Sequence, residues 1–221
     1  ERHVEDLALG LAEAGLDVHL LCAPLPESER SRLAGHGVTA HATAAGDPRR
    51  YSLRYLAGVG RRVRELSVRH RFDLIHAQEF ALGFWNPPLG APALVLSVHG
   101  TITSETPLHA DCRRLLSPSE RPWAWLRFGR RLLYAPFWRR HLRAASRILV
   151  DSAFTRVELD RIVPDCRGII HQVPLAVRES GGDPPGHEGA RRELEWEGMH
   201  LLTIGRLEWQ KGQGAALEAL A

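Results

Sequence analysis

Residues 1–23 read ERHVEDLALGLAEAGLDVHLLCA, and this stretch decides the fold class. Apolar residues recur at helical spacing from Val4 to Ala14, and Gly15 stands where a glycine commonly ends a helix. The apolar run Val18–Ala23 that follows predicts a buried strand. A helix that leads directly into a buried strand is typical of parallel sheets covered by helices.

The same alternation continues through the next 150 residues or so. Strands are predicted at 38–42, 72–77, 93–98, 147–150 and 168–173, and helices at 51–70, 123–145 and 154–161. Ser152 is placed to cap the last of these helices. The chain has 221 residues, 44% hydrophobic and 25% charged, which excludes a mainly disordered protein, and no apolar run approaches the roughly 20 residues that cross a bilayer. We predict an α/β fold with a Rossmann-like parallel sheet.

The pattern restarts near the end of the chain, after a stretch rich in glycine and proline. We expect a first domain over 1–176, a linker over 177–190 and the truncated start of a second Rossmann-like domain over 191–221. Doubly wound sheets open on a strand, and here a helix comes first. We therefore expect the first strand to be missing and the chain to be a fragment that is inactive by itself. In the second part, a helix is predicted at 188–195, a strand at 199–204 and a helix at 212–221.

Charge and cysteine usage narrow the class further. The net charge of +3 is too small to predict nucleic-acid binding, and we expect no nucleic-acid partner. Three cysteines without C-x-x-C spacing argue against a disulfide framework or a zinc site and favour the cytoplasm. Histidines such as His36, His41 and His187 show no ligand spacing and are predicted to be surface residues.

A phosphate-binding pattern lies in the second part of the chain. Gly205-Arg206-Leu207 follows a predicted strand, and Lys211 comes just before the next helix. Helix N-termini attract anions, and Arg and Lys side chains bind phosphate oxygens. Lys211 is the only lysine among the 29 Lys and Arg residues, which favours a specific role. A βα turn with two solvated basic residues is the structural alternative.

These residues resemble those of a known enzyme family. Gly205-Arg206-Leu207 with Lys211-Gly212 resembles the G-R-L-x-x-x-K-G element of the family-four-like retaining glycosyltransferases, whose two facing Rossmann-like domains form the GT-B architecture. Asp73–Gln78 resembles the D-(V/I)-(V/I)-H-x-H segment of that family, and Ser97–Gly100 resembles T-x-H-G/D. Arg147–Leu159 resembles its A-D-x-(I/V)-(I/V)-x-V-S segment with the leucine that follows. Two departures are Gln78, in place of the second histidine, and Val173–Val177, in place of P-N-G-V-D.

The resemblance implies a retaining transfer of a sugar from a nucleotide-sugar donor to an acceptor hydroxyl. His99 would be the catalytic residue that orients the reacting sugar, and Gln78, Glu79 and Gly100 would lie on the acceptor side. Gly205, Arg206 and Lys211 would bind the donor diphosphate, so that no metal and no further cofactor are needed. The family's E-x-x-x-x-x-x-x-E element, which holds the donor sugar, would lie beyond Ala221.

The segment Arg121–Arg147 carries eight arginines and no carboxylate, interleaved with aromatic residues. Basic segments with an aromatic face bind anionic membrane surfaces, so this segment is a candidate for peripheral membrane contact. The family resemblance implies a glycan or lipid-linked acceptor and places such a contact at the inner membrane surface. Pro136 is expected to break the helix, and aromatic packing on the sheet is the structural alternative. Two other functions stay open: another Rossmann-like enzyme such as an epimerase or dehydrogenase, and a non-enzymatic membrane or RNA binder.

Overall fold

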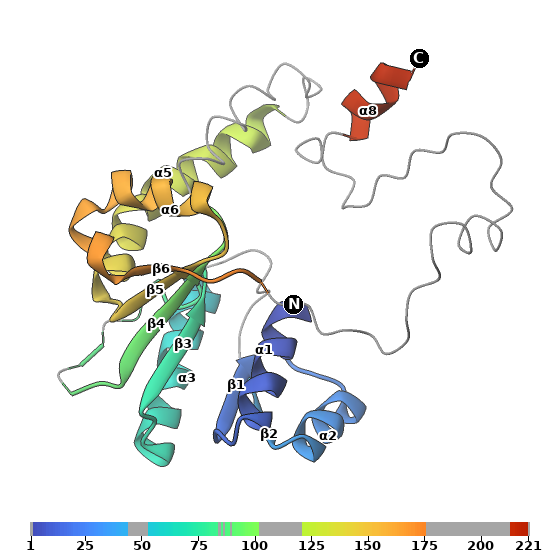
Figure 1. Ribbon diagram of the computed structural model, residues 1–221, viewed down its shortest axis with the longest axis vertical. Coiled ribbons are helices and arrows are strands. Elements are labelled where there is room, and N and C mark those ends of the chain that lie inside the picture. The colour runs from blue at the N-terminus through green and yellow to red at the C-terminus, as the bar shows by residue number, and fades with distance from the viewer. Residues whose placement is uncertain are drawn as a thin grey trace, which may run out of the picture.

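The computed structural model of the chain describes residues 2–43, 53–83, 85, 87–88, 90–101, 121–175 and 213–220. Within these ranges helices and strands alternate along most of the chain, and β4 follows β3 with no described helix between them (Figure 1). The elements are α1 (Arg2–Glu13), β1 (Val18–Cys22), α2 (Glu27–Gly35), β2 (Val38–Ala42), α3 (Leu53–His70), β3 (Leu74–Gln78), β4 (Ala93–Val98), α5 (Arg121–Ala144), β5 (Arg147–Val150), α6 (Ala153–Ile162), the 3-10 helix η3 (Pro164–Ile169), β6 (Ile170–Gln172) and α8 (Gln213–Leu220).

Every strand pair in the described ranges is parallel. β1 and β2 form one sheet, and the larger sheet has the order β3-β4-β5-β6. Parallel strands joined by helices confirm the predicted α/β, Rossmann-like class. Among the described residues β1 pairs only with β2, and β3 only with β4. The expected further strand ahead of α1 stays a prediction.

The larger core surrounds β4. Leu94, Leu96 and Val98 on this strand are between 0% and 2% exposed, because β3 and β5 flank it and helices pack against the sheet. A second core unites α1, α2 and β2 around Leu33 and Val38. Leu21 of β1 packs against the larger core, so the small sheet contacts both. The two cores together fix the positions of the strands, and with them the polar residues that the sequence places at the strand ends.

Several local predictions are confirmed. Gly15 follows α1 with φ +86°, a conformation that glycine adopts readily, and the Ser152 hydroxyl accepts a hydrogen bond of 3.2 Å from the Thr155 amide at the start of α6. Cys22 and Cys166 are free thiols.

The prediction that Pro136 breaks the long basic helix is wrong, because α5 continues through it from Arg121 to Ala144. Proline removes one backbone hydrogen bond, and here the buried side chains of Trp138 and Leu142 in the last turns hold the helix on the core.

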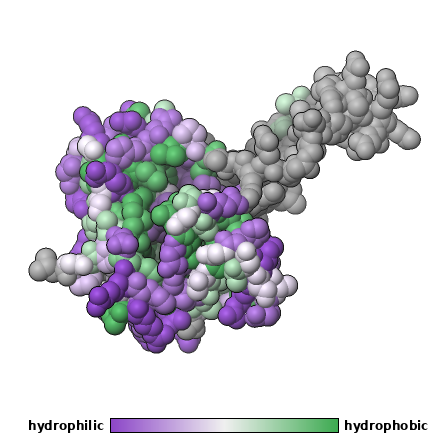
Figure 2. Space-filling view, turned by 60° about the horizontal axis from the view of Figure 1, so that its bottom comes forward, coloured by the Kyte–Doolittle hydropathy of each residue, from purple (hydrophilic) through white to green (hydrophobic). Residues whose placement is uncertain are grey.

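Other predictions lie outside the described residues. They include the linker at 177–190, the helix at 188–195 and the strand at 199–204; of the predicted second domain only α8 is described. Among the described residues, no helix has both the length and the apolar character needed to cross a membrane. Figure 2 shows hydrophobic residues reaching the surface near the middle of one face, with hydrophilic residues around them.

His141 on α5 makes the stability of the fold depend on pH. Its residue surface is 2% exposed, and neither ring nitrogen has a hydrogen-bond partner in the described part of the chain. Burial lowers the pKa of this imidazole from 6.5 to about 4. Between these values the unfolded chain binds more protons than the folded chain, so the free energy of unfolding falls as the pH drops from 6.5 towards 4.

Replacement of this ring by an apolar side chain tests the effect. Between about pH 7.5 and about pH 4.5, the wild type should lose on the order of 2–3 kcal/mol more unfolding free energy than His141→Leu, because the variant lacks the buried titrating group. Urea denaturation at both pH values measures the difference. His171→Leu, at an exposed position on β6, is the control and should follow the wild type. Equal losses in wild type and His141→Leu would contradict the prediction.

Candidate functional site

Three neighbouring parallel strands end together at one edge of the larger sheet. The register pairs Gln78 of β3 with Ser97 of β4, and Val98 of β4 with Val150 of β5. In open α/β sheets, ligands bind outside the carboxyl ends of the strands. The side chains that gather at this edge are therefore the candidate site. We call them the strand-end cluster: His3, His76, Gln78, Glu79, Ser97, His99 and Asp151.

His99 lies at the centre of the strand-end cluster. Its Nε2 is 3.1 Å from Oε1 of Gln78, and its Nδ1 is 3.2 Å from Oδ2 of Asp151. Its backbone N–H donates a 2.7 Å hydrogen bond to Oε1 of Glu79. Three residues that the sequence predicts for the site, His99, Gln78 and Glu79, are thus brought together, while their roles stay predictions.

The two ring contacts determine what the imidazole of His99 can do. When Nδ1–H donates to Asp151, a neutral ring keeps a lone pair on Nε2, and a protonated ring donates from both nitrogens. The His99 side chain is 31% exposed and that of Asp151 is 20% exposed. The ring is therefore held by a carboxylate at Nδ1 and by an amide oxygen at Nε2, while part of its surface stays exposed at the edge of the sheet.

Glu79 supports His99 through an unusual backbone conformation. Its φ is +52°, in the left-handed region that residues other than glycine seldom adopt. Its backbone N–H donates a 2.8 Å hydrogen bond to the carbonyl oxygen of Ser97, and its carboxylate accepts from the amide of His99. Such conformations cost on the order of 1–3 kcal/mol and persist where surrounding contacts fix them. These two bonds fix the turn after β3 against the end of β4.

Two further histidines extend the cluster. His76 on β3 has its Nε2 2.8 Å from the Ser97 hydroxyl, and the His3 ring on α1 meets the His99 ring edge-on at 5.4 Å between centroids. Burial, and then the electrostatic effect of His3 and His99, lowers the pKa of His76 below its ordinary value. The His76 ring and the Ser97 hydroxyl can share their hydrogen bond in either direction. Through the His3 ring, the first turn of α1 contacts the strand-end cluster.

The loop after β4 is tied to α6. Gly100 follows His99 directly and is half-buried, and the buried Thr101 hydroxyl donates to the carboxylate of Glu158 on α6. The predicted acceptor-side residue Gly100 therefore belongs to the same edge of the sheet. The predicted diphosphate residues Gly205, Arg206 and Lys211 lie outside the described residues.

Sequence reasoning did not assign four members of the cluster to the site: His3, His76, Ser97 and Asp151. His76 and Ser97 lie within the segments that resemble the family. Asp151 directly follows β5, so the strand-end rule that singled out His99 applies to it equally. His3 lies on a helix, and nothing in its spacing signals contact with a residue 96 positions later. The signal for Asp151 was present in the sequence, whereas that for His3 exists only in the fold.

The comparisons with known proteins agree with this geometry. The family model described as Glycosyltransferase Family 4 matches residues 1–179, a range that includes every member of the strand-end cluster. A search of the curated proteins finds no match to the chain. The family model covers most of the 221 residues, and the matched range has the parallel α/β fold that the resemblance implied. The chain belongs to glycosyltransferase family 4.

Proposed function

We propose that this chain carries the acceptor-side domain of a retaining glycosyltransferase, which moves a sugar from a nucleotide-sugar donor to an acceptor hydroxyl. The observation that carries the proposal is His99, held between Asp151 and Gln78 at the carboxyl edge of the sheet in a family 4 chain. Membership of this family argues against the epimerase or dehydrogenase alternative.

In the proposed reaction His99 orients the reacting sugar and is the catalytic residue. Asp151 fixes the ring at Nδ1, a sugar hydroxyl takes the place of Gln78 at Nε2, and Gln78, Glu79 and Gly100 line the acceptor side. Hydrogen bonds that are held in place before the reaction lower its barrier, because no reorganisation is needed as charge develops. A sugar ring offers many hydroxyls, and this cluster of imidazoles, amide and carboxylates supplies matching donors and acceptors.

The donor diphosphate is assigned to Gly205, Arg206 and Lys211. As the glycosidic bond breaks, negative charge grows on the leaving diphosphate, and two nearby cations stabilise it. Arg206 supplies a planar fork and Lys211 a compact charge. In this proposal these side chains take the part that a divalent metal plays in other sugar transfers.

A peripheral membrane contact is proposed for one side of α5. Arg139 and Arg140 are exposed there, and so are Leu133 at 71% and Phe137 at 44%. Basic and apolar side chains exposed together favour an anionic lipid surface. The buried Trp138 fits the structural alternative, in which aromatic residues pack on the sheet, so only part of the aromatic set faces solvent. An acceptor linked to lipid at the cytoplasmic face of the membrane would agree with this contact.

His99→Ala in the full-length gene product should lower kcat by about a hundredfold, because one hydrogen-bonding group held in place for the transition state contributes on the order of 10²–10³ in rate. Asp151→Asn keeps the shape of the site and should lower kcat by a smaller factor, since the ring loses its fixed orientation. Turnover with saturating donor, beside a thermal melt of each variant, measures both effects. His171→Ala on exposed β6 is the control. Wild-type turnover by folded His99→Ala would refute the assignment.

Lys211→Ala in the full-length gene product should also cut turnover by about a hundredfold, or roughly 3 kcal/mol in the barrier, because one cation at the leaving group is lost. Lys211→Arg should restore part of the rate. Stability should change by no more than about 0.5 kcal/mol. Arg30→Ala, which removes an exposed positive charge from α2, serves as the control in the same donor titration. Near wild-type turnover of Lys211→Ala would leave the diphosphate role without support.

The membrane proposal predicts salt-sensitive binding to vesicles that contain anionic lipid. Each basic residue near such a surface contributes about 1 kcal/mol, so Arg139→Ser with Arg140→Ser should weaken binding roughly thirtyfold. Arg156→Ser with Arg161→Ser removes the same charge from exposed positions on α6 and should change binding much less. Cosedimentation over a range of salt concentrations measures this. Equal effects of both double variants would favour the packed-helix alternative.

A further inference from the structure

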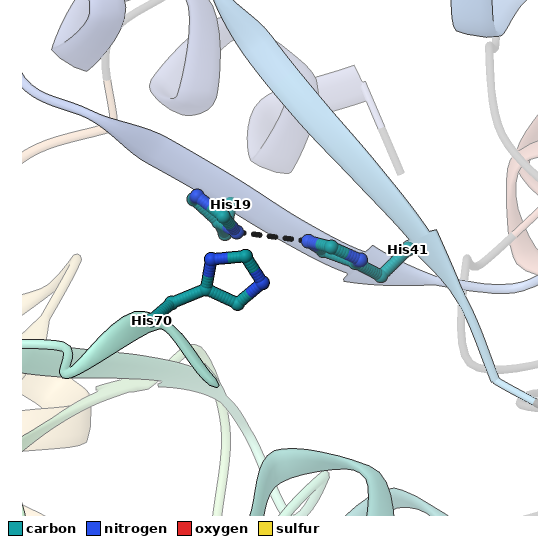
Figure 3. Close-up of side chains that lie close together, drawn as sticks. All are labelled: His19, His41 and His70. Carbon is teal, nitrogen blue, oxygen red and sulfur yellow. Dashed lines mark hydrogen bonds between the residues drawn. The ribbon is translucent and has the colours of Figure 1, made fainter. Parts of the chain in front are cut away.

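Three histidines far apart in sequence meet where the small sheet faces the end of α3. His19 lies near the start of β1, His41 on β2, and His70 is the last residue of α3 (Figure 3). The strand-end cluster lies at the carboxyl ends of β3 to β5 in the larger sheet, whereas His19 and His41 lie on the strands of the small sheet (Figure 1). We call these three residues the histidine triplet. The proposed reaction does not use it.

The register of the small sheet explains why two of the rings meet. β1 and β2 pair His19 with Thr39, and Leu21 with His41. His19 and His41 are therefore diagonal neighbours on one face of the sheet, the face that Leu21 turns toward the larger core. The end of α3 brings His70 over the same face, with 4.3 Å between the ring centroids of His70 and His19. The two strands and the helix converge on a single point.

The nitrogen spacing suits a metal ion. Nδ1 of His19 is 2.8 Å from Nε2 of His41, and one ligand nitrogen from each of the three rings lies within 4.8 Å of the others. Zinc with Zn–N bonds of about 2.0 Å and tetrahedral angles holds its ligand nitrogens about 3.3 Å apart. Binding would require the three rings to rotate until their nitrogens reach that distance. A fourth position stays on the exposed side, where His70 faces solvent.

A carboxylate orients the first ring of the triplet for metal binding. Oδ1 of Asp17 lies 3.5 Å from Nε2 of His19. A proton kept on that nitrogen leaves Nδ1, the atom facing His41, free to bind a metal.

The surroundings add to the attraction for a cation. His70 ends α3, where the carbonyl groups of the last turn concentrate negative partial charge. The nearby guanidinium of Arg62 is positive, and the carboxylate of Glu65 pairs with it at 3.0 Å. The Phe72 ring lies 5.1 Å from His19 and 5.7 Å from His70, so it walls one side of the triplet.

We propose that His19, His41 and His70 form a three-histidine site for a divalent transition metal, zinc first among them. Imidazole ligands suit zinc, copper and nickel. Mg²⁺ prefers oxygen ligands, and the three ligand atoms of the triplet are all nitrogens. The bound ion would clamp the β1–β2 sheet to the end of α3. The site has a structural role and lies apart from the sugar-transfer reaction, so it stands independently of the proposed function.

Zn²⁺ titration of the full chain tests the proposal by a readout other than activity. The wild type should bind one Zn²⁺ through the triplet, and Zn²⁺ should raise its Tm because the ion binds the folded state. His70→Ala should weaken that binding by more than tenfold and abolish the rise in Tm. His36→Ala, at an exposed histidine just after α2, should bind and melt like the wild type. Competition with a chromogenic chelator reports the affinity.

Folding of the variants is checked separately. Thermal melts in chelator show whether His70→Ala folds, and His70→Asn, which keeps a polar side chain at the end of α3, replaces it if it does not. Co²⁺ in place of Zn²⁺ should give the wild type, and neither His70 variant, the visible absorption of a tetrahedral site. Zn²⁺ that leaves the wild-type Tm unchanged, or raises the Tm of a folded His70 variant equally, overturns the proposal and leaves the triplet as a stacked ring cluster.

Discussion

The burial of β4 is the constraint on which the rest of the structure depends. Leu96 is 0% exposed, and its strand lies between two others, so each of its backbone polar groups must be paired within the sheet. Parallel pairing on both sides then sets the register of β3 and β5, and with it the level at which all three strands end. His99 meets Gln78 and Asp151 because of that register.

Much of the fold could be predicted because its signals are local. Apolar runs mark β3, β4 and β5, a glycine at positive φ ends α1, and a serine caps α6. α2 was missed because it has almost no apolar face: Leu33 is its one buried residue. The course of α5 through Pro136 was predicted wrongly, because tertiary packing of Trp138 and Leu142 outweighs a local breaker.

Only the members of the strand-end cluster that directly end or follow a strand could be predicted from the sequence. The rule that ligands bind at the carboxyl ends of strands led to His99, Gln78 and Glu79, and it covers Asp151 as well. It does not reach His3, which comes from the helix that packs over the strand ends. The strand-end rule also does not predict the positive φ of Glu79. Two hydrogen bonds hold that backbone conformation, one from the Glu79 amide to Ser97 of β4 and one from the His99 amide to the Glu79 carboxylate.

His41 shows that the sequence spacing of metal ligands does not predict a site built from separate strands. The sequence indicated a surface residue because no second ligand stands a few positions away, and that rule applies to ligands on one helix or one turn. The structure corrects it: His41 is half-buried and 2.8 Å from a histidine 22 positions earlier. Ligands on two parallel strands are separated by a whole connecting segment, so their spacing follows the length of the crossover and not the geometry of the site.

A metal site built on two parallel strands depends on the strands staying in register, and a metal ion bound there would in turn stabilise that register. The carboxyl edge has the opposite requirement, since its rings must stay open to a substrate. In the two proposals the metal site lies on the small sheet and the reaction at the carboxyl edge of the larger sheet, so both requirements can be met.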